Sequence, residues 1–265
     1  MEAFALLNLL TSSLLKTDAT HALDAFKQTH SDWRKLRHVA IIMDGNRRWA
    51  KERLMPSLLG HKEGSKRLKE IITASTILEL ETLTAYAFST ENWQRSDEEV
   101  SYLMKLMADV LSQDLKVLAD LGVCIKVLGQ QDALPSYLKD VLQHAEAETA
   151  TNTGLRLQLA INYGGRAELT EAVQRIATLV KDGVLLPDEI TEATIESQLT
   201  RCGSILPEPD LVIRTSGEQR LSNFLIWQSA YSELYFTPVT WPDFTVHEYC
   251  DALGTYFNRK RRFGR

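Results

Sequence analysis

Short apolar runs alternate with longer stretches of helical period along most of the chain. Six runs of strand length contain mainly Val, Ile, Leu, Ala and aromatic residues. They span residues 39–43, 82–88, 123–128, 155–161, 211–213 and 233–237. Most show no polar alternation, which is typical of strands buried on both faces, as in a parallel sheet. The pattern predicts a mostly parallel central sheet of about six strands.

Helix-length segments separate these runs. They span about 62–80, 97–121, 135–149, 167–182 and 246–258. The second begins clearly, because Ser96 can cap the helix and Glu99 follows three residues later. Strands alternating with helices predict one α/β domain, with helices flanking the sheet, over residues 38–265.

Residues 1–37 are expected to form a separate N-terminal preface, mainly helical. Residues 1–15 are largely apolar, and no basic residue precedes Lys16, so the start does not resemble a secretory signal. An amphipathic helix resting on the core or on a lipid surface fits better, and the sequence leaves both open.

The composition narrows the class of protein. The 265 residues are 44% hydrophobic and 25% charged, as in soluble globular proteins, and no apolar run reaches the ~18 residues of a membrane span. The three cysteines, Cys124, Cys202 and Cys250, are far apart, which argues against a disulfide framework and favours the cytoplasm. Neither a Walker motif nor a G-x-G-x-x-G motif occurs, so nothing points to an NTPase or a dinucleotide enzyme.

Positive charge is concentrated in two segments of an otherwise acidic chain. Residues 33–72 carry eleven basic and four acidic residues, and residues 258–265 carry five basic residues and no acid, whereas the whole chain has a net charge of −5. The asymmetry indicates an anionic ligand held at a defined place, although basic helix faces that are simply solvated would look similar. It does not favour nucleic-acid binding, which needs a broader basic surface.

Polar, chemically active side chains follow several predicted strands. In parallel α/β sheets, ligands bind beyond the carboxyl ends of the strands. Asp44 follows the first strand and precedes a glycine and two arginines, a combination able to hold a metal ion and phosphate oxygens. An ordinary Asx-Gly turn with Asp44 capping the next helix is the alternative.

Two further strand ends carry similar chemistry. The fifth ends at Arg214 and leads to Arg220, and two guanidinium groups around a glycine suit a phosphate. An arginine paired with Glu218 on a surface turn is the alternative, which the second arginine makes less economical. The polar loop 89–96 suits a lid, or else a solvated loop anchored by Trp93. Residues 162–166 suggest a tight glycine turn with a structural role, and His61 could be a site residue or a capping histidine.

Taken together, these segments resemble the cis-prenyltransferase family, and among them the undecaprenyl diphosphate synthase type. The matching segments are HVAIIMDGNRRWA at 38–50, GHKEG at 60–64, AYAFSTENWQR at 85–95, NYGGR at 162–166, DLVIRTSGEQRLSNFLIWQ at 210–228 and AYSELYFTPVTWPDF at 230–244. The likeness runs in order from residue 38 to residue 264.

The resemblance implies a homodimeric α/β fold with an apolar tunnel. It also implies Mg²⁺-dependent, sequential condensation of isopentenyl diphosphate onto an allylic diphosphate, giving a Z-polyprenyl diphosphate. The enzyme would be cytoplasmic, with peripheral membrane contact for product release as an option. Product length and the preferred primer stay open.

The resemblance also assigns roles to individual residues. Asp44, Asn92 and His61 match the catalytic group, and Asp44 with Glu233 match the metal ligands. The substrate-binding matches are Gly45, Asn46, Arg47, Arg48, Trp49, His61, Ser89, Thr90, Glu91, Trp93, Arg95, Glu99, Arg214, Arg220, Leu221, Ser222, Arg262 and Gly264. Arg262 and Gly264 form an Arg-x-Gly ending that, in the family, reaches the partner subunit's site.

Two other functions compete with this interpretation. Non-catalytic partner subunits of heteromeric prenyltransferases keep the fold but typically lose the aspartate and the phosphate-binding arginines, which this chain retains. A phosphatase with Asp44 as nucleophile is less consistent, because no second carboxylate follows at close spacing.

Overall fold

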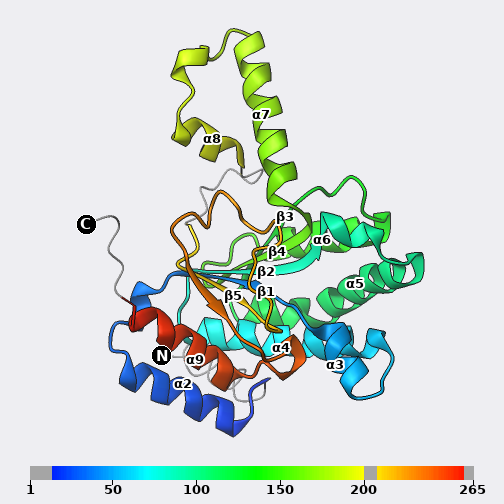
Figure 1. The fold of residues 1–265 in the computed structure, drawn as a ribbon, viewed down its shortest axis with the longest axis vertical. Helices are drawn as coiled ribbons and strands as arrows, with labels where there is room; N and C mark the ends of the chain where they lie inside the picture. The colour runs from blue at the N-terminus through cyan, green and yellow to red at the C-terminus, as the bar shows by residue number, and fades with distance from the viewer. Residues whose placement is uncertain (1–13, 200–207, 260–265) are drawn as a thin grey trace.

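The computed structural model describes residues 14–199 and 208–259, and its centre is a six-stranded sheet (Figure 1). All neighbouring strands are parallel, in the order β3-β4-β2-β1-β5-β6. The strands are β1 (His38–Ile42), β2 (Thr82–Ser89), β3 (Cys124–Leu128), β4 (Arg156–Tyr163), β5 (Leu211–Arg214) and β6 (Glu233–Phe236). This confirms the predicted single α/β domain, and each apolar run became a strand with ends within two residues of those predicted.

Helices fill the connections between the strands. The α-helices are α2 (Thr17–Thr29), α3 (Asn46–Glu52), α4 (Ser57–Ile77), α5 (Asp97–Asp120), α6 (Ser136–Glu148), α7 (Gly165–Lys181), α8 (Glu192–Leu199) and α9 (Val246–Phe257). The described part of the chain also contains the short 3₁₀ turns η1 (Trp33–Lys35), η2 (Thr90–Gln94), η3 (Pro187–Glu189) and η4 (Trp241–Asp243). The predicted start of α5 is confirmed, because Ser96 Oγ accepts from Glu99 N at 3.3 Å.

The two faces of the sheet are covered differently. On one face, Val39 and Ile41 of β1 belong to a large core shared with α2, α4, α5, α6 and α9. The opposite face carries a smaller cluster in which Ala40 and Ile42 pack with Phe224 of the β5–β6 connection. The alternation of successive residues between the two faces explains why β1 is apolar throughout.

The N-terminal segment is helical where it is described. Helix α2 lies along α9, and its Leu23 and Phe26 belong to the large core. The apolar stretch 1–13 lies outside the described residues, so its expected amphipathic helix is not tested. No described helix combines the length and the apolar character that crossing a membrane requires.

Helices α7 and α8 extend away from the sheet as an arm (Figure 1). Arg175 of α7 donates to the Gln198 carbonyl of α8, which holds the two helices together. Several large apolar side chains of the arm are exposed, among them Val173, Val184 and Leu186.

Candidate active site

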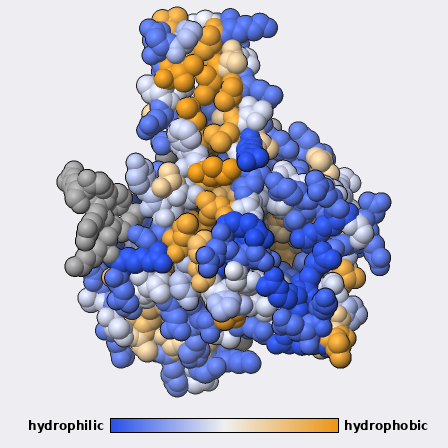
Figure 2. Space-filling view, viewed as in Figure 1, coloured by the Kyte–Doolittle hydropathy of each residue, from blue (hydrophilic) through white to orange (hydrophobic). Residues whose placement is uncertain are grey.

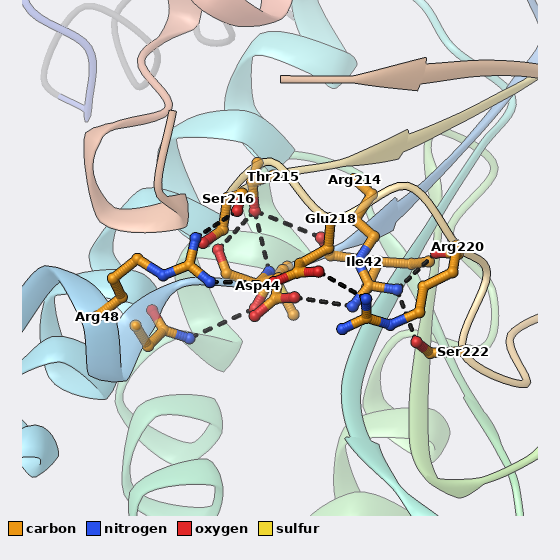
Figure 3. Close-up of polar contacts among 11 residues, drawn as sticks. Ile42, Asp44, Arg48, Arg214, Thr215, Ser216, Glu218, Arg220 and Ser222 are labelled. Carbon is orange, nitrogen blue, oxygen red and sulfur yellow. Dashed lines mark hydrogen bonds and ion pairs between the residues drawn. The ribbon is translucent and has the colours of Figure 1, made fainter. Parts of the chain in front are cut away.

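Asp44 and Arg214 meet where β1 and β5 end side by side. Successive connections leave these two strands toward opposite edges of the sheet, and such a switch point is where α/β folds bind ligands. Arg214 Nη2 donates to Asp44 Oδ2 at 2.8 Å (Figure 3). Arg214 is 4% exposed and its Nε has no hydrogen-bond partner, so the guanidinium keeps a donor for an anionic ligand.

Backbone contacts fix Asp44 beside the β5 loop. Thr215 Oγ1 accepts from Asp44 N at 2.9 Å and also lies 2.6 Å from the Asp44 carbonyl. Gly45 follows with φ +104°, and a Cβ there would lie 2.8 Å from Ser216 Oγ. The N-cap of α3 is Gly45, so the alternative in which Asp44 caps the helix is wrong.

Two more arginines flank this pair from opposite sides (Figure 3). Arg48 donates to the Ser216 carbonyl at 2.5 Å and to Glu218 at 3.1 Å, while Arg220 donates to Glu218 at 2.6 Å. The hydrogen bonds from Arg220 and Arg48 lower the pKa of Glu218. The alternative in which an arginine pairs with Glu218 is thus found in the structure, but the arginines are Arg220 and Arg48 and not Arg214.

Arg214 also orders the loop that carries Arg220. Its Nη1 donates to the Arg220 carbonyl at 2.5 Å and to Ser222 Oγ at 2.6 Å. Ser222 has φ +48°, an uncommon conformation for a serine, and the buried guanidinium helps to hold it. Three predicted site residues, Arg214, Arg220 and Ser222, are therefore one connected group.

The predicted lid residues form η2 at the end of β2. Ser89 N donates to Asn92 Oδ1 at 3.1 Å, so the Asn92 amide caps this turn. Trp93 Nε1 donates to Asn162 Oδ1 at 2.7 Å, and Asn223 donates to Glu91 at 2.8 Å. The lid is thus attached both to the end of β4 and to the β5–β6 connection.

His61 lies in a charged cluster between α4 and α5. Glu99 accepts from Arg95 at 2.9 Å, and Arg47 lies 3.9 Å from it. His61 Nε2 is buried and lies 3.5 Å from Glu99 Oε1, with no hydrogen bond between them. Burial, with a contribution from the positive Arg95, lowers the pKa of His61 to about 4. At neutral pH the ring is therefore uncharged.

A cavity of about 700 Å³ runs inward from these groups. Its mouth includes Asp44, His61, Asn92 and Arg214, and its deeper wall is built mainly from aliphatic side chains of α4 and α5. The deeper wall includes Leu68, Ile72, Leu103, Leu106, Met107, Val110, Leu111, Leu118, Leu142, Leu157 and Leu159. A polar mouth over an apolar interior suits a ligand with an anionic head and a hydrocarbon tail.

The remaining predicted site residues have diverse surroundings. Trp49 Nε1 donates to Asp243 at 2.8 Å, and Asn46 Oδ1 is buried without a partner at the cavity wall. Leu221 packs against the small core cluster, and Thr90 Oγ1 lies beside Gly164. Arg262 and Gly264 lie outside the described residues.

Within one chain, Glu233 lies far from Asp44 along the sheet. The strand register pairs Glu233 with Leu211, which in turn pairs with Val39, five residues before Asp44. At 3.3 Å per residue the separation along the strands is about 16 Å. Arg259 donates to Glu233 at 2.7 Å instead. Its assignment as a metal ligand stays a prediction.

The sequence interpretation missed the contribution of residues 162–166 to the site. Asn162 has φ +49° and holds Trp93, and Arg166 lines the cavity. The sequence did contain a signal, because the Asn-Tyr-Gly-Gly-Arg segment stands at a strand end. Its two glycines favoured the interpretation of a structural turn over that of a site. Asn223, another residue of left-handed conformation, had no recognisable local signal.

Comparisons with known proteins agree with this geometry. A family model described as "Putative undecaprenyl diphosphate synthase" matches residues 42–264. The isoprenyl transferase of Shouchella clausii is 51% identical over 228 residues, which cover 86% of this chain and 88% of that protein. The isoprenyl transferase of Geobacillus kaustophilus is 50% identical over 227 residues, with coverages of 86% and 88%.

Two solved structures share the fold. Lavandulyl diphosphate synthase from Lavandula x intermedia, in complex with dimethylallyl diphosphate, has a TM-score of 0.84 at 42% identity and covers 86% of this chain and 98% of its own. A probable undecaprenyl diphosphate synthase from Campylobacter jejuni has a TM-score of 0.71 at 29% identity, with coverages of 87% and 99%. The chain therefore belongs to the undecaprenyl diphosphate synthase family of isoprenyl transferases.

Proposed function

We propose that the protein catalyses sequential cis-condensation of isopentenyl diphosphate onto an allylic diphosphate such as farnesyl diphosphate. The observation that carries this proposal is the Asp44–Arg214 pair at the mouth of a deep apolar cavity. Along α5 the lining runs from Leu103 to Leu118, about 22 Å at 1.5 Å per residue. Such depth supports a growing hydrocarbon chain rather than a single five-carbon unit.

The residues at the mouth fit a magnesium–diphosphate complex. Mg²⁺ is usually held by one or two carboxylates together with substrate phosphates and water. Asp44 supplies one carboxylate, and no described cluster of three acidic, His or Cys side chains could hold a metal unaided. Bound there, Mg²⁺ would neutralise charge on the departing diphosphate.

The chain's own groups have distinct tasks in this reaction. The C–O bond of the allylic diphosphate breaks, the double bond of isopentenyl diphosphate forms a bond to the freed carbon, and a proton is lost. Arg48, Arg214 and Arg220 would bind the phosphates and stabilise negative charge as it develops. The lid residues Asn92 and Trp93 would exclude water from the allylic cation.

Two properties of the assembled enzyme belong to the same proposal. Exposed apolar side chains run along the α7–α8 arm (Figure 2), which supports a homodimer built through the arm. Release of a water-insoluble product into a membrane is supported by Leu54, 96% exposed beside Arg53, at the turn after α3. The enzyme itself would be cytoplasmic.

One assay distinguishes the proposed condensation from the two alternatives, a phosphatase and a non-catalytic subunit. Purified protein receives Mg²⁺, farnesyl diphosphate and labelled isopentenyl diphosphate, and the products are separated by chain length. Label in polyprenyl diphosphates supports the proposal. Phosphate release without elongation would indicate a phosphatase, and no turnover at all would indicate a non-catalytic subunit.

A further inference from the structure

An ion pair interrupts the apolar wall of the cavity. Lys69 Nζ lies 2.5 Å from Asp114 Oδ1, and both residues line the cavity. The other charged residues of the described lining lie in loops or near element ends at the mouth, whereas Lys69 lies near the middle of α4 and Asp114 lies in the last third of α5. The pair joins the two helices that form most of the aliphatic wall.

The pair stands part of the way down the cavity. Lys69 comes eight residues after His61, about 12 Å along α4. Asp114 comes eleven residues after Leu103, about 16 Å along α5. Apolar lining continues beyond it, because Leu118 comes one helical turn after Asp114, and Leu142 and Leu157 also face the cavity. The space for a hydrocarbon therefore has an upper and a lower section with charge between them.

The cost of this charge depends on what fills the cavity. Lys69 and Asp114 side chains are 29% and 21% exposed, so water in an unfilled cavity can hydrate them. A hydrocarbon that passes the pair displaces that water, and dehydrating an ion pair is unfavourable even when the two charges stay together. Chain growth past Lys69 and Asp114 therefore meets a barrier that an aliphatic wall would not give.

We propose that the Lys69–Asp114 pair determines product length by limiting growth into the lower section of the cavity. This inference rests on the proposed chain-elongating function and adds the residues that set its specificity. Neither residue contacts Asp44 or the phosphate-binding arginines, so the pair acts on the tail of the product and not on the reacting atoms.

The test compares product lengths of paired variants. The double variant Lys69→Met/Asp114→Leu removes both charges, and a charge swap, Lys69→Asp/Asp114→Lys, keeps a pair. The control is Glu63→Leu/Lys66→Met, because that pair, 2.6 Å apart on α4, is exposed and does not line the cavity. Each protein is incubated with Mg²⁺, farnesyl diphosphate and labelled isopentenyl diphosphate, after its thermal unfolding has confirmed that it folds.

We expect the apolar double variant to shift the product distribution toward longer chains by one or more isoprene units. The first condensation should keep its rate, and the swap and the control should keep the wild-type distribution. An unchanged distribution in a folded double variant would overturn the inference, as would equal lengthening by the charge swap. Failure of the wild type itself to elongate would instead refute the proposed function.

Discussion

Asp44 and Arg214 are held in place by contacts that are largely independent of the ion pair between them. Asp44 is held by the backbone of β1 and by Thr215, so its position does not depend on its own carboxylate. Replacing it should therefore remove chemistry and leave the fold in place. The buried Arg214 would still keep hydrogen bonds to Ser222 and to the Arg220 carbonyl.

We predict that Asp44→Ala lowers kcat for condensation by at least ~10²-fold, the scale of one lost charge-stabilising group. Steady-state kinetics with both diphosphates and circular dichroism measure turnover and folding together. Asp140→Ala, at an exposed carboxylate on α6, is the matched control and should behave as wild type. Near-normal kcat in well-folded Asp44→Ala would contradict the assignment.

His61 gives a pH prediction whose sign follows from its lowered pKa. The folded value is about 4, whereas an unfolded histidine titrates near 6.5. Between these values the unfolded chain binds more protons, so this contribution to stability is present above pH 6.5 and is lost as the pH falls toward 4. Its full size is on the order of 3 kcal/mol.

His61→Gln should flatten that part of the stability profile. Urea unfolding between pH 4 and 7 measures the free energy of unfolding for wild type and variant. His21→Gln is the control, since His21 is exposed on α2. Parallel pH profiles for wild type and His61→Gln would show that His61 is not buried in its neutral form.

Charged residues that directly follow an apolar run could be predicted as site residues, whereas a residue whose role depends on one tertiary contact could not. Asp44 and Arg214 each follow an apolar run, and the rule that ligands bind beyond parallel strand ends brings them together. Asn162 escaped because its role depends on Trp93, 69 positions away. For Glu233, the match to a family motif gave no information on strand register, so its position beside Leu211 could not be predicted.

Among the elements, the lid turn η2 depends on side-chain contacts more than on its own short helix. Its Trp93 is half-exposed, and Asn162 Oδ1 at 2.7 Å fixes the indole. A five-residue 3₁₀ turn has little intrinsic stability, so these contacts determine where it lies. The order of the lid should therefore respond to a change in β4.

We predict that Asn162→Ala reduces kcat/KM about fivefold, the equivalent of one hydrogen bond of ~1 kcal/mol. The Trp93 fluorescence, obtained by subtracting the spectrum of Trp93→Phe, should shift toward that of a more solvated indole. Asn152→Ala is a useful control, because the Asn152 amide also donates to backbone carbonyls, those of Ala119 and Val123, but these lie between the end of α5 and the start of β3 and not at the lid. An unaltered Trp93 spectrum in Asn162→Ala would argue against the lid contact.

The boundaries of the helices could be predicted where apolar residues recur clearly at helical spacing. Helix α4 begins at Ser57, five residues earlier than expected, because Gly60 and Gly64 lower helix propensity in its first turns. The glycines are required by packing, since a Cβ on Gly60 would lie 1.9 Å from the Asn46 carbonyl oxygen. The short α3 and the polar α8 carry too few apolar positions to show a period.

For the whole molecule, the arm offers an exposed apolar surface that suits the proposed homodimer. Val173 and Leu186 are 61% and 56% exposed, and their neighbours Val184 and Ile190 are also exposed. Contact between two copies would remove this apolar area from water. At the base of the same arm, Glu168 accepts hydrogen bonds from Tyr163 and Gln228, and burial raises its pKa. The base of the arm is therefore joined to the sheet, while the apolar side chains further out stay exposed.

We predict that Val173→Asp/Leu186→Asp converts a dimer into a monomer. Light scattering coupled to size-exclusion chromatography measures the mass directly. Leu54→Asp is the matched control, because Leu54 is equally apolar and more exposed but belongs to the turn after α3. A dimer that survives the arm substitutions would place the interface elsewhere.

Because β5 pairs with β1 but is synthesised much later, the site can form only late in translation. Asp44 and Arg214 are 170 positions apart, so at 5–20 residues per second the ribosome adds Arg214 on the order of 10 to 30 s after Asp44. During that interval the edge of β1 that later pairs with β5 has no partner, which exposes a nascent chain to aggregation. A ribosome-bound chain stalled before residue 211 should therefore bind no diphosphate and should engage chaperones through β1.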